Sequence, residues 1–335
     1  MEPDGSRYAV LDLIVEVPVV PAPEWQAIGR VLGFDWGVRT LVTACAVSLS
    51  GQQVDRPFFL DTGAFDGRQA RIQRQMDRLK GKVDRLEMRL AALPQDVPTR
   101  SCLEGRLPVW RREIARCWRK YHARNRDLAH LAANVLLLLA TVQGCPFIAG
   151  ESLKTMKSTG RGRDARGRWR NWRNNSQIRG ELWRVLKYKC HLAGVHLEWQ
   201  RPRGTSHTCP RCGQSANTYR SPAEHIQAED WGAWLWCVAC GWNGSRDYAA
   251  ALNIARLGAA FLTHYQQTGR FYHASIAELS TKVVSYSGTA AVLRLPPPGL
   301  RPRPKLSGRT DCNGWFHSVS LHSSYALPMM LRLCG

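Results

Sequence analysis

The chain has 335 residues, a length that corresponds to about two domains, and 44% of them are hydrophobic, which is enough for a buried core. Lys and Arg total 47 against 26 Asp and Glu, so the formal net charge is +21. Clustered cations are the electrostatic signature of proteins that bind polyanions, so this balance favours a nucleic-acid partner over a small-metabolite enzyme.

The same sequence disfavours a membrane protein and a secreted protein. The longest apolar stretch, residues 131–142, is shorter than the roughly 20 residues that cross a bilayer, so no membrane partner is expected. The start of the chain lacks the basic region of a signal peptide. The 11 cysteines are an odd number and mostly scattered, which in a reducing compartment indicates a metal site plus buried thiols. We therefore expect a cytoplasmic protein.

Extended segments dominate the first 60 residues. Alternating patterns predict strands over 8–19, 31–35, 40–49 and 54–60. Gly51 supplies a turn between the last two, so the strands after residue 30 are expected to form an antiparallel meander.

The period then changes to that of a helix. Apolar residues recur in steps of four and three at Ile72, Met76, Leu79, Val83, Leu86 and Leu90. A second helix is expected over 110–142, and together they predict an antiparallel helical hairpin with one very basic face. That face is either an ordinary solvated surface or a nucleic-acid contact, and its excess of Arg favours the second interpretation.

The next segments return to an alternation of strand and helix. A short apolar strand over 146–149 ends at Glu151, and the most basic stretch, 154–203, begins with a loop that we expect to become ordered on a partner. A helix over 176–193, a strand over 195–199 and a helix over 247–257 are predicted. Periodicity is lost beyond residue 269.

Two CxxC pairs form the strongest motif. Cys209 and Cys212, with Cys237 and Cys240, can place four thiolates around one Zn²⁺ in the tetrahedral arrangement that this ion prefers. Gly213 and Gly241 follow the second cysteine of each pair, where the turn needs a positive φ. A redox pair or coincidence are the alternatives. A closed shell of four thiolates leaves no place for a substrate, so this zinc would be structural.

Three acids stand at the ends of predicted elements. Asp35 ends a strand, Glu151 ends another, and Asp247 begins a helix. Each has an ordinary explanation by itself: a turn residue, a charge at a strand end and a helix N-cap. Their order along the chain, with the four cysteines between the second and the third, is more specific.

The segments GFDWGVRTLVT, AGESL, TSHTCPRCG…CVACGW and SRDYAAALNIA resemble the TnpB (OrfB) family of transposon-encoded nucleases, whose nuclease module is shared with the miniature type V CRISPR effectors. The resemblance covers roughly residues 30–260. It implies an α/β fold with an RNase H-like (RuvC) domain, an inserted basic helical hairpin and an inserted zinc ribbon. It also implies a guide-RNA-directed DNA endonuclease with roles in transposition and DNA recombination.

The resemblance also assigns residues and boundaries. Asp35, Glu151 and Asp247 match the three acidic motifs, which hold two Mg²⁺ or Mn²⁺ ions, with Asp35 shared by both. The implied divisions are a remnant of an N-terminal β domain (1–30), the nuclease core (31–204, hairpin at 66–143), the zinc ribbon (205–244), the final core helix (245–268) and an irregular tail (269–335).

This sequence departs from the family pattern in two respects. Ser152, Ser245 and Ala249 replace residues that usually flank the second and third acids. Only about 30 residues precede the first motif, so we expect a truncated or split member of the family with impaired target recognition, in which a partner polypeptide is one source of the missing region. Two alternatives follow: a catalytically silent nucleic-acid-binding protein, or a zinc-ribbon protein of the transcription machinery, which leaves the acids unexplained.

Overall fold

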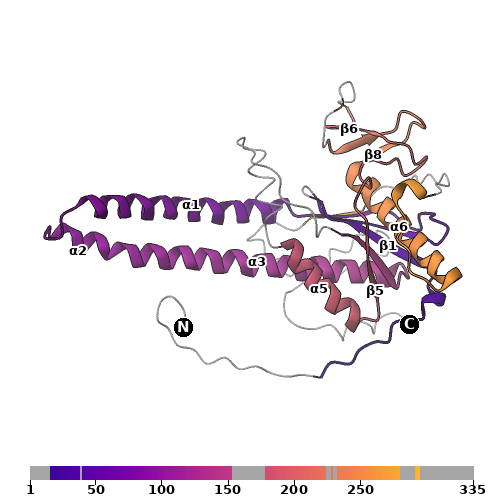
Figure 1. Cartoon of the computed structure of the whole chain (residues 1–335), viewed down its shortest axis with the longest axis horizontal. Coiled ribbons are helices and arrows are strands. Elements are labelled where there is room, and N and C mark those ends of the chain that lie inside the picture. Colours follow the sequence, from indigo (N-terminus) through magenta and orange to yellow (C-terminus); the bar gives the residue numbers. More distant parts are fainter. Residues whose placement is uncertain are drawn as a thin grey trace, which may run out of the picture. The chain divides into compact units, whose positions relative to one another are not determined.

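The computed structural model describes residues 16–37, 40–152, 178–223, 228, 232–279 and 291–294. The chain divides into two units, 1–297 and 298–335, and the second lies outside the described residues. The first unit is a mixed α/β structure with two sheets (Figure 1). No helix in the described ranges combines the length and the apolar character of a membrane span.

The larger sheet is mixed and has the order β5-β4-β1-β2-β3-β9. Its strands are β1 (Arg30–Asp35), β2 (Thr40–Ser48), β3 (Phe58–Asp61), β4 (Phe147–Glu151), β5 (His196–Gln200) and β9 (Ala291–Arg294). β1, β2 and β3 pair antiparallel, so the predicted meander is confirmed. β4 and β5 are parallel to β1.

Two strand expectations differ from the structure. The described part of the predicted strand at 8–19, residues 16–19, has no regular structure, and Val17 and Val19 are exposed, so no partner strand covers them there. Conversely, β9 lies in the stretch where periodicity is lost and pairs parallel with β3. β9 pairs with β3, which is distant in the sequence, and a pairing of this kind leaves no periodic pattern in the local sequence.

Strand alternation divides the core into two layers. Leu32 and Phe34 of β1 face one side, where they pack with α3 (Arg106–Val142) and α5 (Ile178–Leu192). Val31 faces the other side, against α6 (Arg246–Thr268). The sheet is therefore covered on both faces, by α3 and α5 on one and α6 on the other.

The helix α6 lies very close to the sheet. A Cβ on Gly33 of β1 would overlap the backbone of Ala255, and a Cβ on Gly258 would lie 2.6 Å from the Cβ of Ala149 on β4. Small residues at these positions let the helix and sheet backbones approach, which fixes the height of α6 above the strands.

A pair of long helices extends from the sheet (Figure 1). α1 (Gly63–Ala92) packs along α3, and α2 (Thr99–Glu104) connects them. Of the six seam residues predicted on α1, all except Leu79 are buried. Gln69 donates a hydrogen bond to Asn125 Oδ1 at 2.5 Å across the pair.

A small second sheet, of order β6-β7-β8, precedes α6. It contains β6 (Asn217–Tyr219), β7 (Trp234–Trp236) and β8 (Asn243–Ser245), all antiparallel. Two single-turn helices, η1 (Trp25–Ala27) and η2 (Ile276–Glu278), complete the described elements.

Candidate functional site

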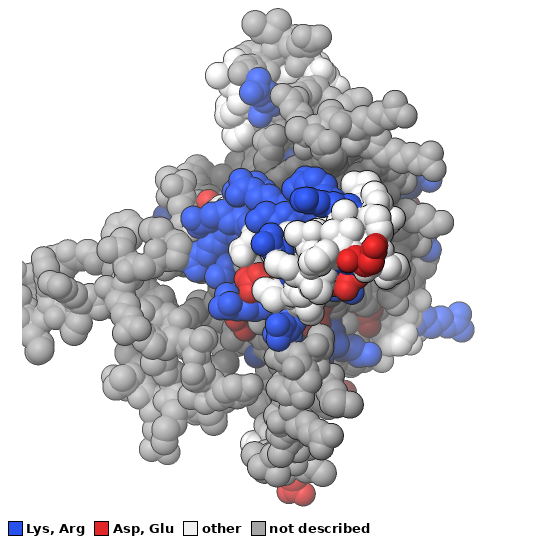
Figure 2. Space-filling model, turned by 90° about the vertical axis from the view of Figure 1, so that its left-hand side faces the viewer, with Lys and Arg blue, Asp and Glu red and all other residues white. Residues whose placement is uncertain are grey.

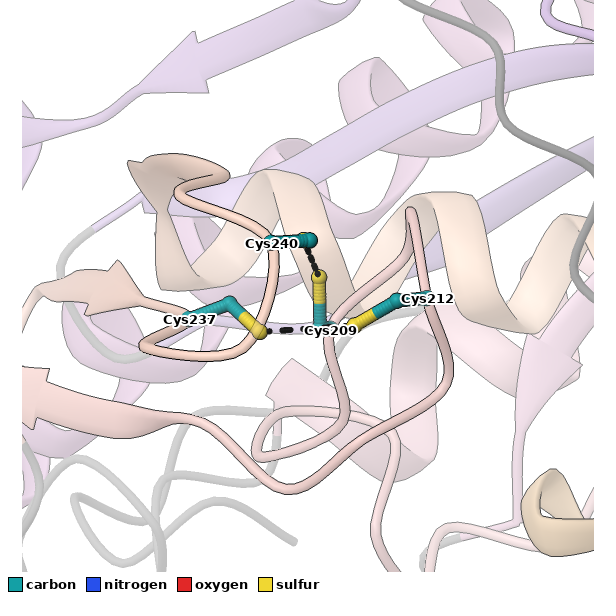
Figure 3. A group of neighbouring side chains, drawn as sticks. All are labelled: Cys209, Cys212, Cys237 and Cys240. Carbon is teal, nitrogen blue, oxygen red and sulfur yellow. Dashed lines mark hydrogen bonds between the residues drawn. The ribbon is translucent and has the colours of Figure 1, made fainter.

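The four predicted cysteines converge. Their sulfur atoms all lie within 4.8 Å of one another (Figure 3). The Sγ atoms of Cys209 and Cys240 are 3.5 Å apart, and those of Cys212 and Cys237 are 3.4 Å apart. Four tetrahedral sulfurs at the usual Zn–S length of about 2.3 Å would be about 3.8 Å apart. The cluster thus has the donor set and the size that could hold a zinc ion.

Each pair of cysteines lies on a matching tight turn. Gly213 N–H donates to the Cys209 carbonyl and Gly241 N–H to the Cys237 carbonyl, both at 2.9 Å. The two glycines have φ of 72° and 71°, as the sequence predicted. The turns make the two halves of the cluster similar, so both pairs present their thiols in the same way.

Two buried side chains of α6 hold the first cysteine turn. Asn253 donates to the carbonyls of Thr205 and Thr208 at 2.8 and 2.9 Å. Arg256 donates to the carbonyl of Pro210, between the first two cysteines, and to that of Gly51 in the β2–β3 turn. The loop that carries Cys209 and Cys212 is thereby fixed to both α6 and the sheet.

The topology brings the three predicted acids to one edge of the sheet. Asp35 and Glu151 end β1 and β4, which are neighbouring parallel strands in a register that pairs Phe34 with Gly150. Asp247 lies in the first turn of α6, and its Oδ2 would be 3.1 Å from a Cβ on Gly37, two residues beyond Asp35. Three distant segments therefore supply one carboxylate each to the same region.

The electrostatics show that the acids interact. Asp35 is only 8% exposed. Burial raises the pKa of its carboxyl well above the usual range, and the nearby Glu151 and Asp247 raise it further, while Arg246 opposes them. Within the described ranges, only the cysteine group has all its ligand atoms within 4.8 Å. The three acids are thus more widely spaced than the four cysteines, and the charges of Glu151 and Asp247 both act on Asp35.

Sequence reasoning gave no role to Thr205 and noted Ala249 only as a departure from the family pattern. Thr205, which is 1% exposed, donates a hydrogen bond to Glu151 Oε1 at 3.2 Å. Its only sequence signal is its place four residues before Cys209. Ala249, noted as a departure from the family pattern, is fully buried in the core of the cysteine cluster with Leu235, so it is a packing position.

The helical pair carries a basic surface. Figure 2 looks onto the end where α1, α2 and α3 meet and shows Lys and Arg gathered there with few acids. We define the basic surface as the exposed cations of α1 and α3: Arg71, Arg74, Arg78, Lys80, Lys82, Arg85, Arg89, Arg106, Arg111, Arg112, Arg116, Arg119, Lys120 and Arg126. The ammonium groups of Lys80 and Lys82 lie 5.3 and 5.8 Å from the rings of Trp118 and Trp110. Residues 153–177, most of the predicted basic loop, lie outside the described residues.

The fold and the site define a mixed α/β protein with a four-cysteine cluster next to an acidic sheet edge. Residues 180–254 match the family model described as Cas12f1-like, TNB domain. This segment contains all four cysteines and Asp247, so the match supports the predicted resemblance to the TnpB-like, Cas12-related nucleases where its most specific motifs lie. A comparison with the curated proteins gives no significant match.

Solved structures with similar chains include several RNA-bound proteins. Cas12f1 in complex with sgRNA and target DNA is 15% identical with a TM-score of 0.45, and the match covers 70% of this chain and 51% of that one. The mini-RNA-guided endonuclease CRISPR-Cas phi3 is 16% identical (TM-score 0.42; 72% and 48%). C2c1 of Alicyclobacillus acidoterrestris with single-guide RNA is 11% identical (TM-score 0.42; 72% and 40%). The matched region thus spans about half or less of each of these proteins.

Proposed function

We propose that this chain is a metal-dependent DNA endonuclease of the TnpB type, with a RuvC-like core, that is directed by a guide RNA. The observation that carries the proposal is the placement of Asp35, Glu151 and Asp247. Asp35 and Glu151 end two parallel strands, and Asp247 lies at the start of a helix. Glu151 and Asp247 both raise the pKa of Asp35. The cysteine cluster between the second and third acids in sequence supports the same assignment.

The residues at the acidic edge fit divalent cations. Asp35 is a buried carboxylate beside two other acids, an arrangement that is unfavourable without a compensating cation. Carboxylate oxygens are the ligands that Mg²⁺ and Mn²⁺ prefer. The family resemblance implies that Asp35 would be shared by two ions and that Glu151 and Asp247 would each complete one. When bound, two such ions supply charge stabilisation for the attacking and leaving oxygens of a phosphodiester.

The protein side chains around the acids orient and balance them. Thr205 donates a hydrogen bond to one oxygen of Glu151. Arg246 lowers the electrostatic cost of ionising Asp35. In the same proposal the zinc ion bound by the four cysteines is structural, since its ligand shell is complete.

The nucleic-acid partners in this proposal are inferred from the positive charge of the helical pair. The basic surface of α1 and α3 would contact the backbone of DNA or of a guide RNA, because phosphate neutralisation dominates such binding. The match at 180–254 to a Cas12f1-like domain supports an RNA-guided mode. The proposed domain boundaries at 30, 204, 244 and 268, and a second polypeptide that supplies target recognition, belong to this proposal.

The decisive experiment measures cleavage. Purified protein with Mg²⁺ and single-stranded DNA is expected to nick the substrate, and Asp35→Ala, Glu151→Ala and Asp247→Ala are each expected to abolish the activity. Asp84→Ala on the exposed side of α1 is the matched control and should cleave normally. Equal cleavage by wild type and Asp35→Ala would contradict the proposal. Salt-sensitive binding without any cleavage would favour the catalytically silent alternative.

The guide RNA is tested separately. RNA that copurifies with the protein is extracted and sequenced, and cleavage of a matching DNA is compared before and after removal of that RNA. Loss of specific cleavage on RNA removal supports guidance. Identical cleavage of matched and unmatched DNA restricts the function to an unguided nuclease.

A further inference from the structure

The carboxyl ends of neighbouring strands carry a row of polar side chains. Thr43 of β2 pairs with Asp35 of β1. Glu151 of β4 pairs with Gln200 of β5, and the register of β1 and β4 places Asp35 beside Glu151. In order across the sheet, the row is Thr43, Asp35, Glu151, Gln200. Both proposed metal ligands of the sheet therefore lie between two uncharged polar residues.

All four side chains belong to the α6 face. On β5, the Trp199 ring packs on Trp183 of α5, so the next residue, Gln200, lies on the opposite face. The same alternation holds on β4, where Ile148 packs with α3 and α5, and Ala149 packs with α6. Glu151, two residues after Ala149, shares its face. Gln200 is thus on the side of the sheet where α6 brings Asp247.

Gln200 is buried without hydrogen bonds from its side chain. It is 1% exposed, and neither its Oε1 nor its Nε2 has a partner among the described residues. Buried amides in proteins nearly always have partners, so such a group needs an explanation. By contrast, nearby Asn253 is equally buried and uses its Nδ2 twice. The amide oxygen and nitrogen of Gln200, which make no hydrogen bonds to the described residues, lie next to the acids, and this placement indicates that they bind a ligand.

We propose that Gln200 is a further catalytic residue, which contacts the hydrated metal ion and the scissile phosphate through its side-chain amide. This inference rests on the proposed function. Mg²⁺ keeps several bound waters in protein sites, and these waters are donors that the amide oxygen can accept from. The amide N–H can donate to a phosphate oxygen. A neutral amide suits this position because a fourth carboxylate would add another negative charge beside Glu151, its partner in the register of β4 and β5.

The test compares three substitutions at this position. Gln200→Met and Gln200→Leu keep the volume and remove both polar atoms, and Gln200→Glu replaces the amide by a metal-binding carboxylate. Mn²⁺ alone is titrated into each zinc-loaded protein, and free Mn²⁺ is measured by electron paramagnetic resonance. Thermal unfolding is measured without added Mn²⁺, and cleavage is measured last.

The expected result is a separation of binding from stability. Gln200→Met and Gln200→Leu should weaken Mn²⁺ binding at the Asp35-dependent site by about 10-fold, within the range for groups around a metal, while their Tm stays equal or rises. Gln200→Glu should bind Mn²⁺ at least as tightly as wild type. Gln69→Leu, a buried glutamine of the helical pair with an unpartnered Oε1, is the control and should leave Mn²⁺ binding unchanged.

Two results would overturn the inference. One is unchanged Mn²⁺ binding in Gln200→Met and Gln200→Leu, and the other is an equal loss in Gln200→Met and Gln200→Glu, which marks a packing role. In both cases the proposed function stands if Asp35→Ala still removes Mn²⁺ binding. If wild type binds no Mn²⁺ that depends on Asp35, the proposed function fails and this inference fails with it.

Discussion

The Thr205 hydroxyl lies 3.2 Å from Glu151 Oε1 and 3.0 Å from the Pro202 carbonyl oxygen, so its single proton is shared between two acceptors. This contact connects the loop before the cysteine cluster to the end of β4. The carbonyl of Thr205 is in turn held by Asn253 of α6 at 2.8 Å. Because α6 also carries Asp247, one buried chain of contacts joins two of the three acids to the cysteine loop.

The hydroxyl of Thr205 is the first point to test. Thr205→Val keeps the shape and removes the donor that Glu151 shares with the Pro202 carbonyl. Glu151 then loses one of the contacts that orient it, and we expect cleavage to fall by about 10- to 100-fold. Thr205→Ser keeps the hydroxyl and should restore most of the activity. The measurement is the rate of Mg²⁺-dependent nicking, read beside a thermal melt. A valine variant with wild-type Mg²⁺ dependence and rate would show that the bond does not position Glu151.

Asn253 is expected to matter for stability. Asn253→Ala leaves the buried carbonyl of Thr205 and the partly buried carbonyl of Thr208 without this donor, which should lower the free energy of unfolding by about 2 kcal/mol. Urea unfolding measures this change. Asn243→Ala, at an exposed position of β8, is the control and should stay within about 0.5 kcal/mol of wild type.

The close approach of α6 to the sheet predicts a strong difference between two glycines. Gly33→Ala places a methyl group against the backbone of Ala255, so we expect a loss of about 2–4 kcal/mol in the free energy of unfolding. Gly29→Ala meets nothing within 4 Å and should change stability by less than about 0.5 kcal/mol. Similar unfolding midpoints for the two variants would contradict the packing described here.

Metal removal should affect one specific part of the molecule. We expect about one zinc per chain by elemental analysis, lost when Cys212 is changed to Ser and retained when the exposed Cys102 is changed to Ser. A chelator should increase hydrogen exchange in β6, β7 and β8 before the larger sheet is affected. Full zinc content in Cys212→Ser would reject the four-thiolate site.

Buried thiols outside the cluster give a pH-dependent prediction. Burial raises the pKa of Cys45, Cys145 and Cys190 to about 12 each. Only the thiolate reacts with iodoacetamide, so at pH 8 about one such thiol in 10⁴ is reactive even before access is considered. Labelling followed by peptide mapping should therefore modify the exposed Cys102 before these three buried thiols. The rate at the three buried thiols should rise about tenfold per pH unit while the fold persists.

Patterns along the chain predict what depends on local spacing. The apolar steps from Ile72 to Leu90 predict the buried seam of α1, and the CxxC pairs predict the convergence of four sulfurs. In both cases the partners are close in sequence or belong to a repeated motif with a known chemical requirement.

Other features depend on distant segments and escaped such reasoning. The local apolar pattern predicts a helix only over 247–257, whereas α6 continues to Thr268 and packs on four strands of the larger sheet. Gln200 and Thr205 acquire their importance from the register of β4 with β5 and from a loop conformation. A glutamine or a threonine alone carries no signal of that kind.

The α6 helix also fixes the directions in which its side chains point relative to one another. Asp247 faces the acidic edge, Asn253 binds the cysteine loop and Ala255 contacts Gly33, all on one uninterrupted helix. Each residue of an α-helix advances the side-chain direction by about 100°. A single inserted residue between Asp247 and Asn253 would therefore turn the acid away while the rest of the helix kept its contacts. The spacing of these three positions along α6 is as important to the site as their identities.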